Sequence, residues 1–544
     1  MKISKDLINL FKEQKKSING GMIFLIIVSE LSSVAIITLI GIGSSETAVR
    51  EINWTHIFLF GLTIVISYFS NKLYSDKMNV VTENITNDLR KKLTAKLKDS
   101  DLYAYERIGE SILLARIMKE TDAISQSLPY IISLVKASTL AIFCFGYMLY
   151  LSPFAFIIFT SFSGLGYLIY DHYNKISYEY WNTALKKDVS LFDAFANILH
   201  GFKEIKLSSK KKEEIYDIFT SVSNELIDYK IKSWKVYNAN DNFYYALIYV
   251  AVGIIIFALP SITPMKTADS IKLLALIIYV LNPFWTIASS IPAIGQIDIT
   301  LQLILEVERK LDASSERVVV DAADGVETIT DFSEIRFEDV SFQYYEKDLP
   351  AFKAGPFDFS IKKGEILFIT GGNGCGKSTL LKLIATLYHS QTGNISVDNT
   401  KITRKLIKPY RELFGSVFSD FHLFDKLYGV AEVDEDRLHK LLQLMQIDDK
   451  TQYVNGGFTA INLSTGQKKR LALVAALMEN RPIYLLDEWA AEQDPYFHHY
   501  YYKTLLPDLK KQGKTLVVIS HDDRYFGSAD RLVKMEYGQI VSIT

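Results

Sequence analysis

The distribution of apolar residues divides the chain into two parts. Up to about residue 300, long apolar stretches alternate with charged segments, whereas the remainder has the shorter apolar runs of a soluble α/β domain. Each long stretch has roughly the ~17–25 residues that a helix needs to cross a bilayer. The stretches lie at residues 20–43, 55–74, 128–150, 153–170, 242–260 and 269–293. We expect six transmembrane helices, because burial in a soluble core would explain one such stretch but not six.

The segments between the apolar stretches indicate how the chain is oriented. Lysine and arginine are frequent in residues 1–19 and in the long, helix-patterned segments 75–127 and 172–241, whereas the short connections 44–54 and 261–268 hold one basic residue each. Basic residues are concentrated on the cytoplasmic side of a membrane. We therefore expect the N-terminus, both long segments and everything after the sixth helix on the cytoplasmic side.

A change of composition near residue 300 separates the membrane part from the rest. We expect a transmembrane domain over residues 1–300, a polar linker over 301–332 and a second domain over 333–544. In the second domain, the apolar strand "GEILFIT" runs directly into a glycine-rich loop, and a helical pattern follows that loop. This order of elements predicts an α/β domain that binds phosphate.

The glycine-rich loop "GGNGCGKST" matches the pattern G-x-x-x-x-G-K-[ST], which is a strong signal between a strand and a helix. Glycines let backbone N–H groups surround a β-phosphate, Lys377 neutralises the β and γ oxygens, and Ser378 offers a hydroxyl to Mg²⁺. Cys375 occupies a free position, either as a small filler or as a redox sensor. The residues expected to bind nucleotide here are Gly371, Gly372, Asn373, Gly374, Cys375, Gly376, Lys377, Ser378 and Thr379.

Two later strands supply the groups that complete such a site. The strand "PIYLLD" ends in Asp487, which is suited to hold Mg²⁺ through water, and Glu488 follows, where it can orient or deprotonate an attacking water. A third strand, "KTLVVIS", delivers His521 at its carboxyl end, where ligands of a parallel sheet bind. We expect His521 to contact the γ-phosphate, a structural role being the alternative.

The stretch "INLSTGQKKRLAL" has the pattern of a helix start. Ser464 stands where an N-cap residue would, and an apolar-periodic run follows it. The first N–H groups of such a helix and its dipole together favour an anion. No phosphate-binding lysine motif lies beside it in the sequence, so the helix pattern alone leaves open which anion it binds and which molecule supplies it.

Composition and charge narrow the class of protein. The net charge of −2 provides no basic field for nucleic acid, so no nucleic-acid partner is expected. Only two cysteines occur, Cys144 and Cys375, which excludes a disulfide framework and favours a reducing compartment for the soluble part.

Together, these motifs resemble those of ABC exporters of the six-helix, half-transporter kind. The residues that resemble the family signature LSGGQ, with threonine in place of the first of its two glycines, are Leu463, Ser464, Thr465, Gly466 and Gln467. In that family the signature helix points at the γ-phosphate of ATP held by the phosphate loop of a second nucleotide domain. The resemblance implies a polytopic α-helical membrane domain with six transmembrane helices, followed by an α/β P-loop ABC nucleotide-binding domain. It also implies ATP and Mg²⁺ as cofactors and a homodimer as the simplest assembly, surrounded by membrane lipid.

The resemblance assigns roles to further residues. Tyr344 matches the aromatic that stacks on adenine, with Tyr345 as the second choice. Ser419 stands where the family has a glutamine that contacts Mg²⁺ and signals to the membrane domain. The serine hydroxyl, a water or Asp420 would then take the place of that glutamine. Asp494 matches the aspartate of the loop that crosses the dimer interface.

Two stretches of the long cytoplasmic segments resemble the short coupling helices that dock on the nucleotide domain. They are "DLYAYERIGE" at 101–110 and "KLSSKKKEE" at 206–214, for which solvated charged helices are the alternative. Coupling helices serve alternating access. The two long cytoplasmic segments therefore argue against a membrane-anchored regulatory ABC ATPase without transport.

Several motifs narrow the resemblance to one subgroup. "LSTGQKKRLAL", "VFSDFHLF", "ISHDDRYF" and Trp489 in "LLDEWAAEQDP" resemble the cyclic-peptide and siderophore-peptide (pyoverdine-type) exporters of bacteria. Most ABC exporters have "DEPTSALD" after the acidic pair instead. The expected function is ATP-driven export of a peptide-type molecule across the bacterial cytoplasmic (inner) membrane, with a lipid or lipopeptide flippase as the alternative.

Two ionisable residues, Glu30 and Lys136, lie inside predicted spans at comparable depth. Charges there are rare and usually face a cavity or each other. They either form a structural pair or line the substrate cavity. Four aromatic residues either pack against rings of a transported peptide or simply pack the helices: Tyr244, Tyr245, Tyr249 and Trp285.

Overall fold

The computed structural model describes residues 20–47, 53–263, 267–316, 329–346 and 349–544. They form two compact units. The first unit takes its described residues from Met1–Lys91 and Arg116–Leu305, and the second from Lys92–Ala115 and Glu306–Thr544. Each unit is described by itself.

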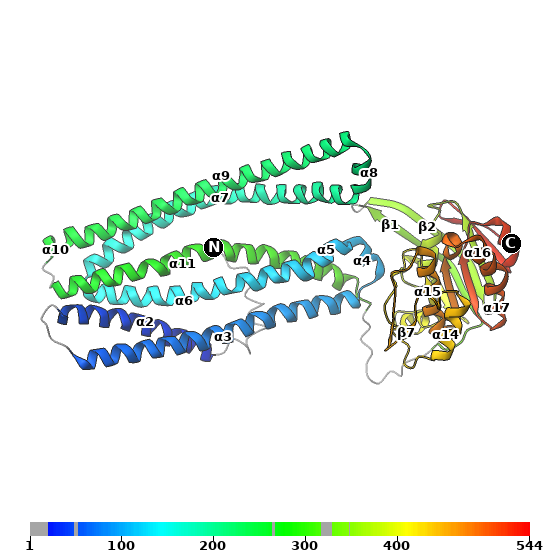
Figure 1. Cartoon of the computed structure of the whole chain (residues 1–544), viewed down its shortest axis with the longest axis horizontal. Coiled ribbons are helices and arrows are strands. Elements are labelled where there is room, and N and C mark those ends of the chain that lie inside the picture. The colour runs from blue at the N-terminus through cyan, green and yellow to red at the C-terminus, as the bar shows by residue number, and fades with distance from the viewer. Residues whose placement is uncertain (1–19, 48–52, 264–266, 317–328, 347–348) are drawn as a thin grey trace. The chain divides into compact units, whose positions relative to one another are not determined.

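The first unit is built of long helices, as predicted. Its main helices are α2 (Gly20–Thr47), α3 (Trp54–Lys98), α6 (Thr121–Leu151), α7 (Pro153–His200), α9 (Ser209–Gly253) and α11 (Thr267–Ala313), drawn from blue to green in Figure 1. Among the described residues, six helices are long and apolar enough to cross a membrane, which agrees with the predicted number of spans. The 48 residues of α7 correspond to about 70 Å, roughly twice a bilayer core. The charged segments between the spans are therefore largely continuations of the same helices.

Short elements complete the helical connections. They are α4 (Leu102–Ile108), α5 (Glu110–Leu114), the π-helical turns η1 (Ala115–Glu120) and η2 (Ile254–Ala258), α8 (Phe202–Leu207) and α10 (Leu259–Ile262). The connection between the third and fourth spans consists of Ser152 alone, which ends α6 and caps α7. Its N–H donates to Met148 O at 2.9 Å, and its Oγ accepts the N–H of Ala155 at 3.3 Å. Pro153 then occupies the first turn of α7, where its missing N–H costs nothing.

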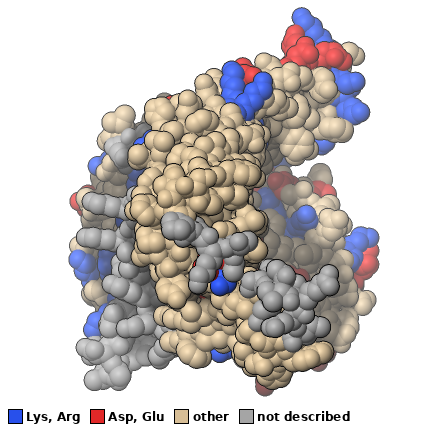
Figure 2. Space-filling model, turned by 90° about the vertical axis from the view of Figure 1, so that its left-hand side faces the viewer, with Lys and Arg blue, Asp and Glu red and all other residues tan. Residues whose placement is uncertain are grey.

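The interior of the first unit lies where α6, α7, α9 and α11 meet. Cys144, Phe159, Ile248 and Leu276 are almost completely buried there. In contrast, large apolar side chains such as Phe58 are exposed on α3, as lipid-facing positions require. Most of the surface seen in Figure 2 belongs to side chains that are neither basic nor acidic.

The expected linker differs from the structure at its start. Helix α11 continues to Ala313, so residues 301–313 are helical rather than linker. Residues 317–328 of the predicted linker lie outside the described residues.

The second unit contains two main sheets. An antiparallel sheet has the order β2-β1-β4-β5, with β1 (Glu334–Glu346), β2 (Leu349–Lys362), β4 (Thr392–Val397) and β5 (Thr400–Lys401). The larger sheet has the order β12-β11-β3-β10-β9-β6, with β3 (Ile366–Gly371), β6 (Phe414–Val417), β9 (Ile483–Asp487), β10 (Thr515–Ile519), β11 (Arg531–Glu536) and β12 (Gln539–Ile543). All of its pairs are parallel except β11 with β12. The carboxyl ends of β3, β9 and β10 therefore meet at one edge, where α/β sheets bind ligands.

Helices and a small hairpin complete this unit. They are α12 (Lys377–Ile384), α13 (Ile407–Arg411), α14 (Glu435–Leu444), α15 (Thr465–Met478), α16 (Pro495–Tyr500) and α17 (Leu506–Lys511), with 3-10 turns η3 (Trp489–Glu492) and η5 (Asp523–Ser528), the π-turn η4 (Tyr501–Leu505) and the strands β7 (Tyr453–Val454) and β8 (Gly457–Phe458). Every residue of β9 and β10 is buried, as expected for the centre of a covered parallel sheet. Two apolar cores pack on the sheets, one around Phe337 and Leu381 and the other around Trp489 and Leu471.

Candidate nucleotide site

The glycine-rich loop joins β3 to α12, as predicted. Gly371 has φ 152°, and a Cβ there would lie 2.3 Å from the carbonyl oxygen of Met535, so only glycine fits. Gly376 precedes α12 in the left-handed region, with φ 97°. The Nζ atom of Lys377 donates to the carbonyl oxygens of Gly371 and Gly372 at 3.1 Å each. The loop thus holds a cation at the N-terminus of α12, which is the arrangement that binds phosphate.

A cavity of about 570 Å³ lies beside this loop. It brings together groups from the ends of β3 and β9, from the loop after β6 and from β1. Its lining residues are Tyr344, Phe352, Asn373, Gly374, Gly376, Lys377, Ser378, Thr379, Ser419, Asp487 and Glu488. Apart from Phe352, all of them are residues that the sequence singled out.

Tyr344 occupies the aromatic wall of this cavity. Its hydroxyl lies 3.0 Å from Oγ1 of Thr379, and its ring is tilted against Phe352 with centroids 6.2 Å apart. Tyr345 does not line the cavity and is 42% exposed. The geometry therefore favours Tyr344 over Tyr345 as the platform for a base.

Asp487 is almost fully buried at the end of β9, with 2% of its surface exposed. Burial raises the pKa of its carboxyl group, and hydrogen bonds from the Ser419 and Ser378 side chains act in the opposite direction. The Oγ of Ser419 donates to Oδ2 of Asp487 at 3.2 Å. Ser419 thus contacts the acidic residue expected to hold Mg²⁺, although it is much shorter than a glutamine.

The donor set fits Mg²⁺ bound together with a nucleotide. The described residues contain no cluster of three or more His, Cys, Asp or Glu side chains that would cage a metal by themselves. Mg²⁺ prefers one or two protein oxygens completed by phosphates and water. Ser378 and Asp487 would supply those oxygens, and the bound ion would neutralise charge on the phosphate groups.

Glu488 and His521 meet at the edge of the sheet. The Nε2 of His521 lies 2.8 Å from Oε1 of Glu488, and both side chains are more than a third exposed. Glu488 adopts a left-handed conformation with φ 48°, which costs energy for a residue with a side chain. Its carbonyl oxygen accepts the Nζ of the buried Lys469 at 3.0 Å, and the Nε1–H of Trp489 donates to Lys469 O at 2.8 Å. These bonds tie the strained residue to α15.

Helix α15 begins at Thr465, with Ser464 as its N-cap residue. The N–H of Ser464 donates to Oε1 of Gln467 at 3.1 Å. A Cβ on Gly466 would lie 2.7 Å from the carbonyl oxygen of Glu492, so a side chain would push the two segments apart. None of the predicted signature residues, Leu463 to Gln467, lines the cavity that holds the phosphate loop of the same chain.

Asp494 is the N-cap residue of α16, and Arg470 of α15 holds its carboxylate in place. Its carboxylate accepts the N–H of Phe497 at 2.9 Å and the Nη2 of Arg470 at 2.6 Å. The Phe497 N–H and then the guanidinium lower the pKa of Asp494, against a small effect of burial. The guanidinium also lies over the Phe497 ring, 3.7 Å from its centroid, and donates from Nε to Oε1 of Gln493 at 2.7 Å.

Sequence reasoning missed Lys469 and Arg470. Both are basic, yet 4% and 9% exposed, because they bond the loop after β9 from within α15. The available signal was the run of three basic residues directly before the apolar part of "QKKRLALVAAL". Basic residues on a helix are usually solvated, and only their tertiary partners distinguish these two from surface charges.

The first predicted coupling segment, 101–110, belongs to the second unit, where it packs against β1 and α12. It contains α4, whose N-cap Asp101 accepts the N–H of Ala104 at 2.7 Å. The hydroxyl of Tyr103 accepts the N–H of Tyr345 at 3.0 Å, and its ring meets that of Tyr344 edge-on at 5.9 Å. Glu106 pairs with Lys382 at 2.7 Å. Through Tyr103, this segment therefore contacts both Tyr344, which lines the nucleotide cavity, and the adjacent Tyr345.

The second predicted coupling segment, 206–214, has a different structure from the one expected. Helix α8 ends at Leu207 and α9 begins at Ser209, so the segment contains a break between two helices rather than one short helix. Ser208 forms the break because its Oγ accepts the N–H of Lys211 at 3.4 Å, which caps α9.

Glu30 and Lys136 lie together in the first unit. Glu30 on α2 is 3% exposed, and its Oε1 is 3.5 Å from the Nζ of Lys136 on α6. Lys136 also donates to Oδ1 of Asn71 on α3 and lies 5.9 Å from the ring centroid of Tyr74. The pair joins three helices inside the membrane part.

Comparisons with known proteins identify the family of this chain. Residues 20–284 match the family model of the ABC transporter transmembrane region, and residues 355–491 match that of the ABC transporter. The chain is 30% identical to the ATP-binding protein SyrD of Pseudomonas syringae pv. syringae over 95% of this chain and 92% of the relative. It is 22% identical to an ATP-dependent lipid A-core flippase of Methylobacillus flagellatus over 94% and 87%.

A solved structure shares the fold. A bacterial Atm1-family ABC exporter with ATP bound superposes with a TM-score of 0.71 at 17% identity, over 96% of this chain and 94% of that one. This likeness shows that the chain has the fold of that exporter. The chain belongs to the ABC transporter family, as an exporter that binds ATP and couples its hydrolysis to translocation.

Proposed function

We propose that two copies of this chain form a homodimer with two shared ATP sites and export a peptide-type molecule across the bacterial cytoplasmic membrane. The proposal of shared sites rests on one observation: within a single chain, the phosphate loop and the N-terminus of α15 do not form one site. Lys377, Asp487 and Glu488 line the nucleotide cavity, whereas the capped N-terminus of α15 does not. A helix end that favours an anion is then free for the γ-phosphate held by a second copy.

The chemistry follows from the groups at the cavity. Lys377 and the loop N–H groups bind the phosphates, and Tyr344 stacks on the base. Glu488 orients or deprotonates the attacking water, and His521 contacts the γ-phosphate from the neighbouring strand. ATP binding closes the two nucleotide domains on each other and opens the transport cavity outward, and hydrolysis reverses this change. The N-terminus and the nucleotide domains lie in the cytoplasm.

A peptide-type substrate is supported by the motifs around Trp489. Trp489 is 1% exposed and stacks on Tyr501 with ring centroids 4.7 Å apart. Its indole N–H bonds to α15, so this residue fixes the catalytic loop on the signature helix. The resemblance to cyclic-peptide and siderophore-peptide exporters lies in these same segments. A lipid flippase is the second candidate, because full-length relatives at 22–24% identity carry that name.

Assays in proteoliposomes distinguish a peptide exporter from a lipid flippase and from a regulatory ATPase. The purified chain is reconstituted, and ATP hydrolysis is measured with a cyclic peptide, a siderophore-peptide precursor or lipid A-core. We expect stimulation by a peptide and ATP-dependent uptake of that peptide into inside-out vesicles. Stimulation and flipping of lipid alone would replace the peptide proposal by the second candidate. Hydrolysis that no substrate stimulates, without transport of any of them, would favour a regulatory ATPase.

A further inference from the structure

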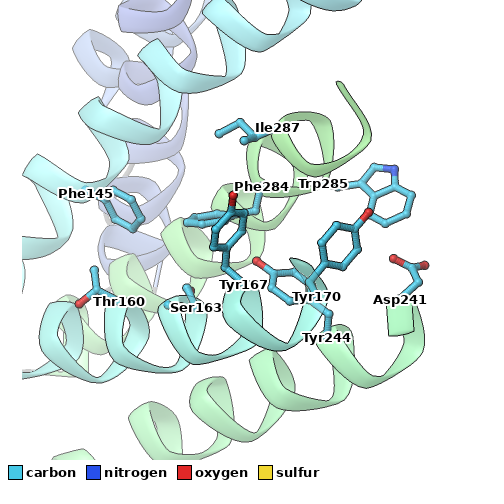
Figure 3. A pocket seen from close by; sticks show the side chains of 11 residues that line it. Phe145, Thr160, Ser163, Tyr167, Tyr170, Asp241, Tyr244, Phe284, Trp285 and Ile287 are labelled. Carbon is cyan, nitrogen blue, oxygen red and sulfur yellow. The ribbon is translucent and has the colours of Figure 1, made fainter. Parts of the chain in front are cut away.

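A cavity of about 350 Å³ lies within the membrane part, between α6, α7, α9 and α11 of a single chain. Its walls are largely aromatic. Tyr167 and Tyr170 come from α7, Tyr244 from α9 and Trp285 from α11. Figure 3 shows these rings around the hollow, with the Asp241 carboxylate near the Trp285 indole at one side. The cavity has room for one bulky side chain of a larger molecule.

Polar atoms in the lining lack partners. Ser163 is 6% exposed, and its Oγ accepts or donates no hydrogen bond among the described residues. One carboxylate oxygen of Asp241 is buried and likewise unpartnered. Buried polar groups are nearly always hydrogen-bonded, so such groups in one cavity call for a ligand or ordered water.

The residues that line this cavity carry negative charge only. Asp241 is its one ionisable acid, and none of its eleven residues is Lys, Arg or His. Asp241 also forms no ion pair with any residue that the structure describes. An unpaired charge at the edge of a membrane span is costly and points to a functional role. Aromatic faces beside a carboxylate attract an organic cation, since both the negative ring faces and the acid favour it.

We propose that this cavity binds an ammonium or guanidinium group, carried on an apolar side chain of the transported molecule. The inference deepens the export function proposed above and rests on it for the identity of the larger molecule. Asp241 pairs with the cation, Tyr167, Tyr244 and Trp285 surround its apolar stem, and Ser163 takes one of its N–H groups. The site discriminates by charge as well as by shape.

The neighbouring helix offers a matched control. The Nδ2 of Asn240 donates to Tyr170 O at 3.0 Å, which places residues 240 and 170 level with each other on α9 and α7. Because α7 and α9 run antiparallel, Asp171 is level with residue 239 and lies only ~3 Å along the helices from the level of Asp241. It pairs with Lys175 at 2.7 Å and does not line the cavity. Asp171→Asn therefore removes the same charge at nearly the same depth, outside the cavity.

Binding is measured with the full chain in nanodiscs without nucleotide. The probes are two radiolabelled cyclic hexapeptides of leucine and phenylalanine that differ at one position, lysine in one and Nε-acetyllysine in the other. We expect the wild type to bind the lysine peptide about tenfold more tightly. Asp241→Asn should reduce this preference to within about twofold, whereas Asp171→Asn and the charge-conserving Asp241→Glu should retain most of it.

ATP-driven uptake of the same peptides into inside-out vesicles tests peptide export separately from the cation site at Asp241. Charge-selective binding that depends on Asp241, without uptake, supports the cation site and contradicts peptide export. Uptake of both peptides with equal affinity, unchanged in Asp241→Asn, contradicts the cation site and leaves export standing. Equal binding of both peptides that added lipid displaces would identify an apolar site for acyl chains and overturn the inference. A loss of charge preference in Asp171→Asn as well would also overturn it.

Discussion

The Nε2 of His521 lies 2.8 Å from Oε1 of Glu488, although 33 residues separate the two in the chain. Strands β9 and β10 are neighbours in register, so the residues after their carboxyl ends meet. Glu488 is additionally held in a left-handed conformation by α15. The backbone position of Glu488 is therefore fixed by α15, and its carboxylate is held by the contact with His521.

The first prediction concerns this pair. Glu488→Gln should retain ATP binding and closure of the dimer, because the shape is kept while the base is lost. Steady-state hydrolysis should fall at least about a hundredfold, the lower range for a general base. The measurement is phosphate release in nanodiscs, together with nucleotide affinity.

A double substitution tests whether the two residues act as a unit. His521→Ala should also lower turnover, and the double variant should be hardly slower than the worse single variant, because groups that act together are not additive. Wild-type turnover in Glu488→Gln would remove Glu488 from the proposed role.

The second prediction concerns Ser419. Ser419→Ala removes the hydrogen bond to the buried Asp487, so we expect hydrolysis and substrate-coupled turnover to fall about tenfold with little change in nucleotide affinity. Ser419→Gln should be tolerated. Ser416→Ala changes an exposed serine of strand β6 that lies outside the cavity lining, and it should behave as wild type. If transport is undiminished in Ser419→Ala, Ser419 does not replace the family's Mg²⁺-contacting glutamine, and Asp420 becomes the next candidate for that role.

Most of the fold could be predicted because it depends on local patterns. Long apolar runs specify spans whatever their neighbours are, and the glycine-rich loop specifies a strand, a turn and a helix at once. Gly371 and Gly376 occupy backbone conformations or contacts that other residues resist, so the motif marks the phosphate loop reliably.

Long-range partners could not be predicted in the same way. The hydrogen bonds from Lys469 and Arg470 to the loop after β9 depend on how α15 packs. The sequence does not distinguish a buried basic residue from a solvated one. The cavity at Asp241 draws on four helices far apart in sequence, and its aromatic residues follow the same spacing as ordinary packing residues. The extent of α11 was missed because a helix outside the membrane needs no apolar run to continue.

The third prediction separates the two roles left open for Glu30 and Lys136. As a structural pair, Glu30→Gln leaves the lysine unpaired inside the membrane part, which should cost roughly 2–4 kcal/mol of stability and lower the melting temperature. The double variant Glu30→Gln/Lys136→Gln should recover much of the loss. Lys210→Gln breaks a highly exposed pair with Glu214 and should have almost no effect. A loss of peptide binding without loss of stability would instead assign the pair to the substrate cavity.

The fourth prediction concerns the pH dependence of stability at Glu316. Burial acts to raise the pKa of this carboxyl, but hydrogen bonds from His389 and Arg411 outweigh it and lower the pKa from 4.5 to about 2. The stabilisation is therefore complete above pH 4.5 and is lost as the pH falls toward 2. Glu316→Gln should cost roughly 2–3 kcal/mol at neutral pH.

Thermal unfolding at a series of pH values tests this direction. The difference between wild type and Glu316→Gln should shrink as the pH falls below 4.5. Asp331 supplies the control, because hydrogen bonds from Lys363 and the Phe332 N–H lower its pKa at an exposed site, where water screens the charge. Asp331→Asn should leave the melting temperature nearly unchanged, and a difference at Glu316 that grows toward acid would contradict the assignment.

The last prediction concerns the shared site. Ser464→Arg places a bulky cation at the N-terminus of α15 and should block hydrolysis, while ATP still binds at Lys377 of the same chain. Lys377→Ala should lose phosphate binding. Each homodimer is then inactive, but a mixed dimer contains one site with both defects and one with neither. Mixing the two variants should therefore restore part of the ATPase activity, provided that one intact site supports turnover.

Crosslinking tests the same geometry without that condition. Cysteines are introduced next to Ser464 and at Gly374 after Cys144 and Cys375, both buried and free, have been replaced. If α15 of one chain faces the phosphate loop of the other, ATP should promote disulfide crosslinks between two chains, visible as a dimer band on a non-reducing gel. Glu488→Gln should increase the yield, because it retains the closed state by preventing hydrolysis. Crosslinks that form only within a single chain, with or without ATP, would contradict the shared site, since they would place both parts of one site in the same copy.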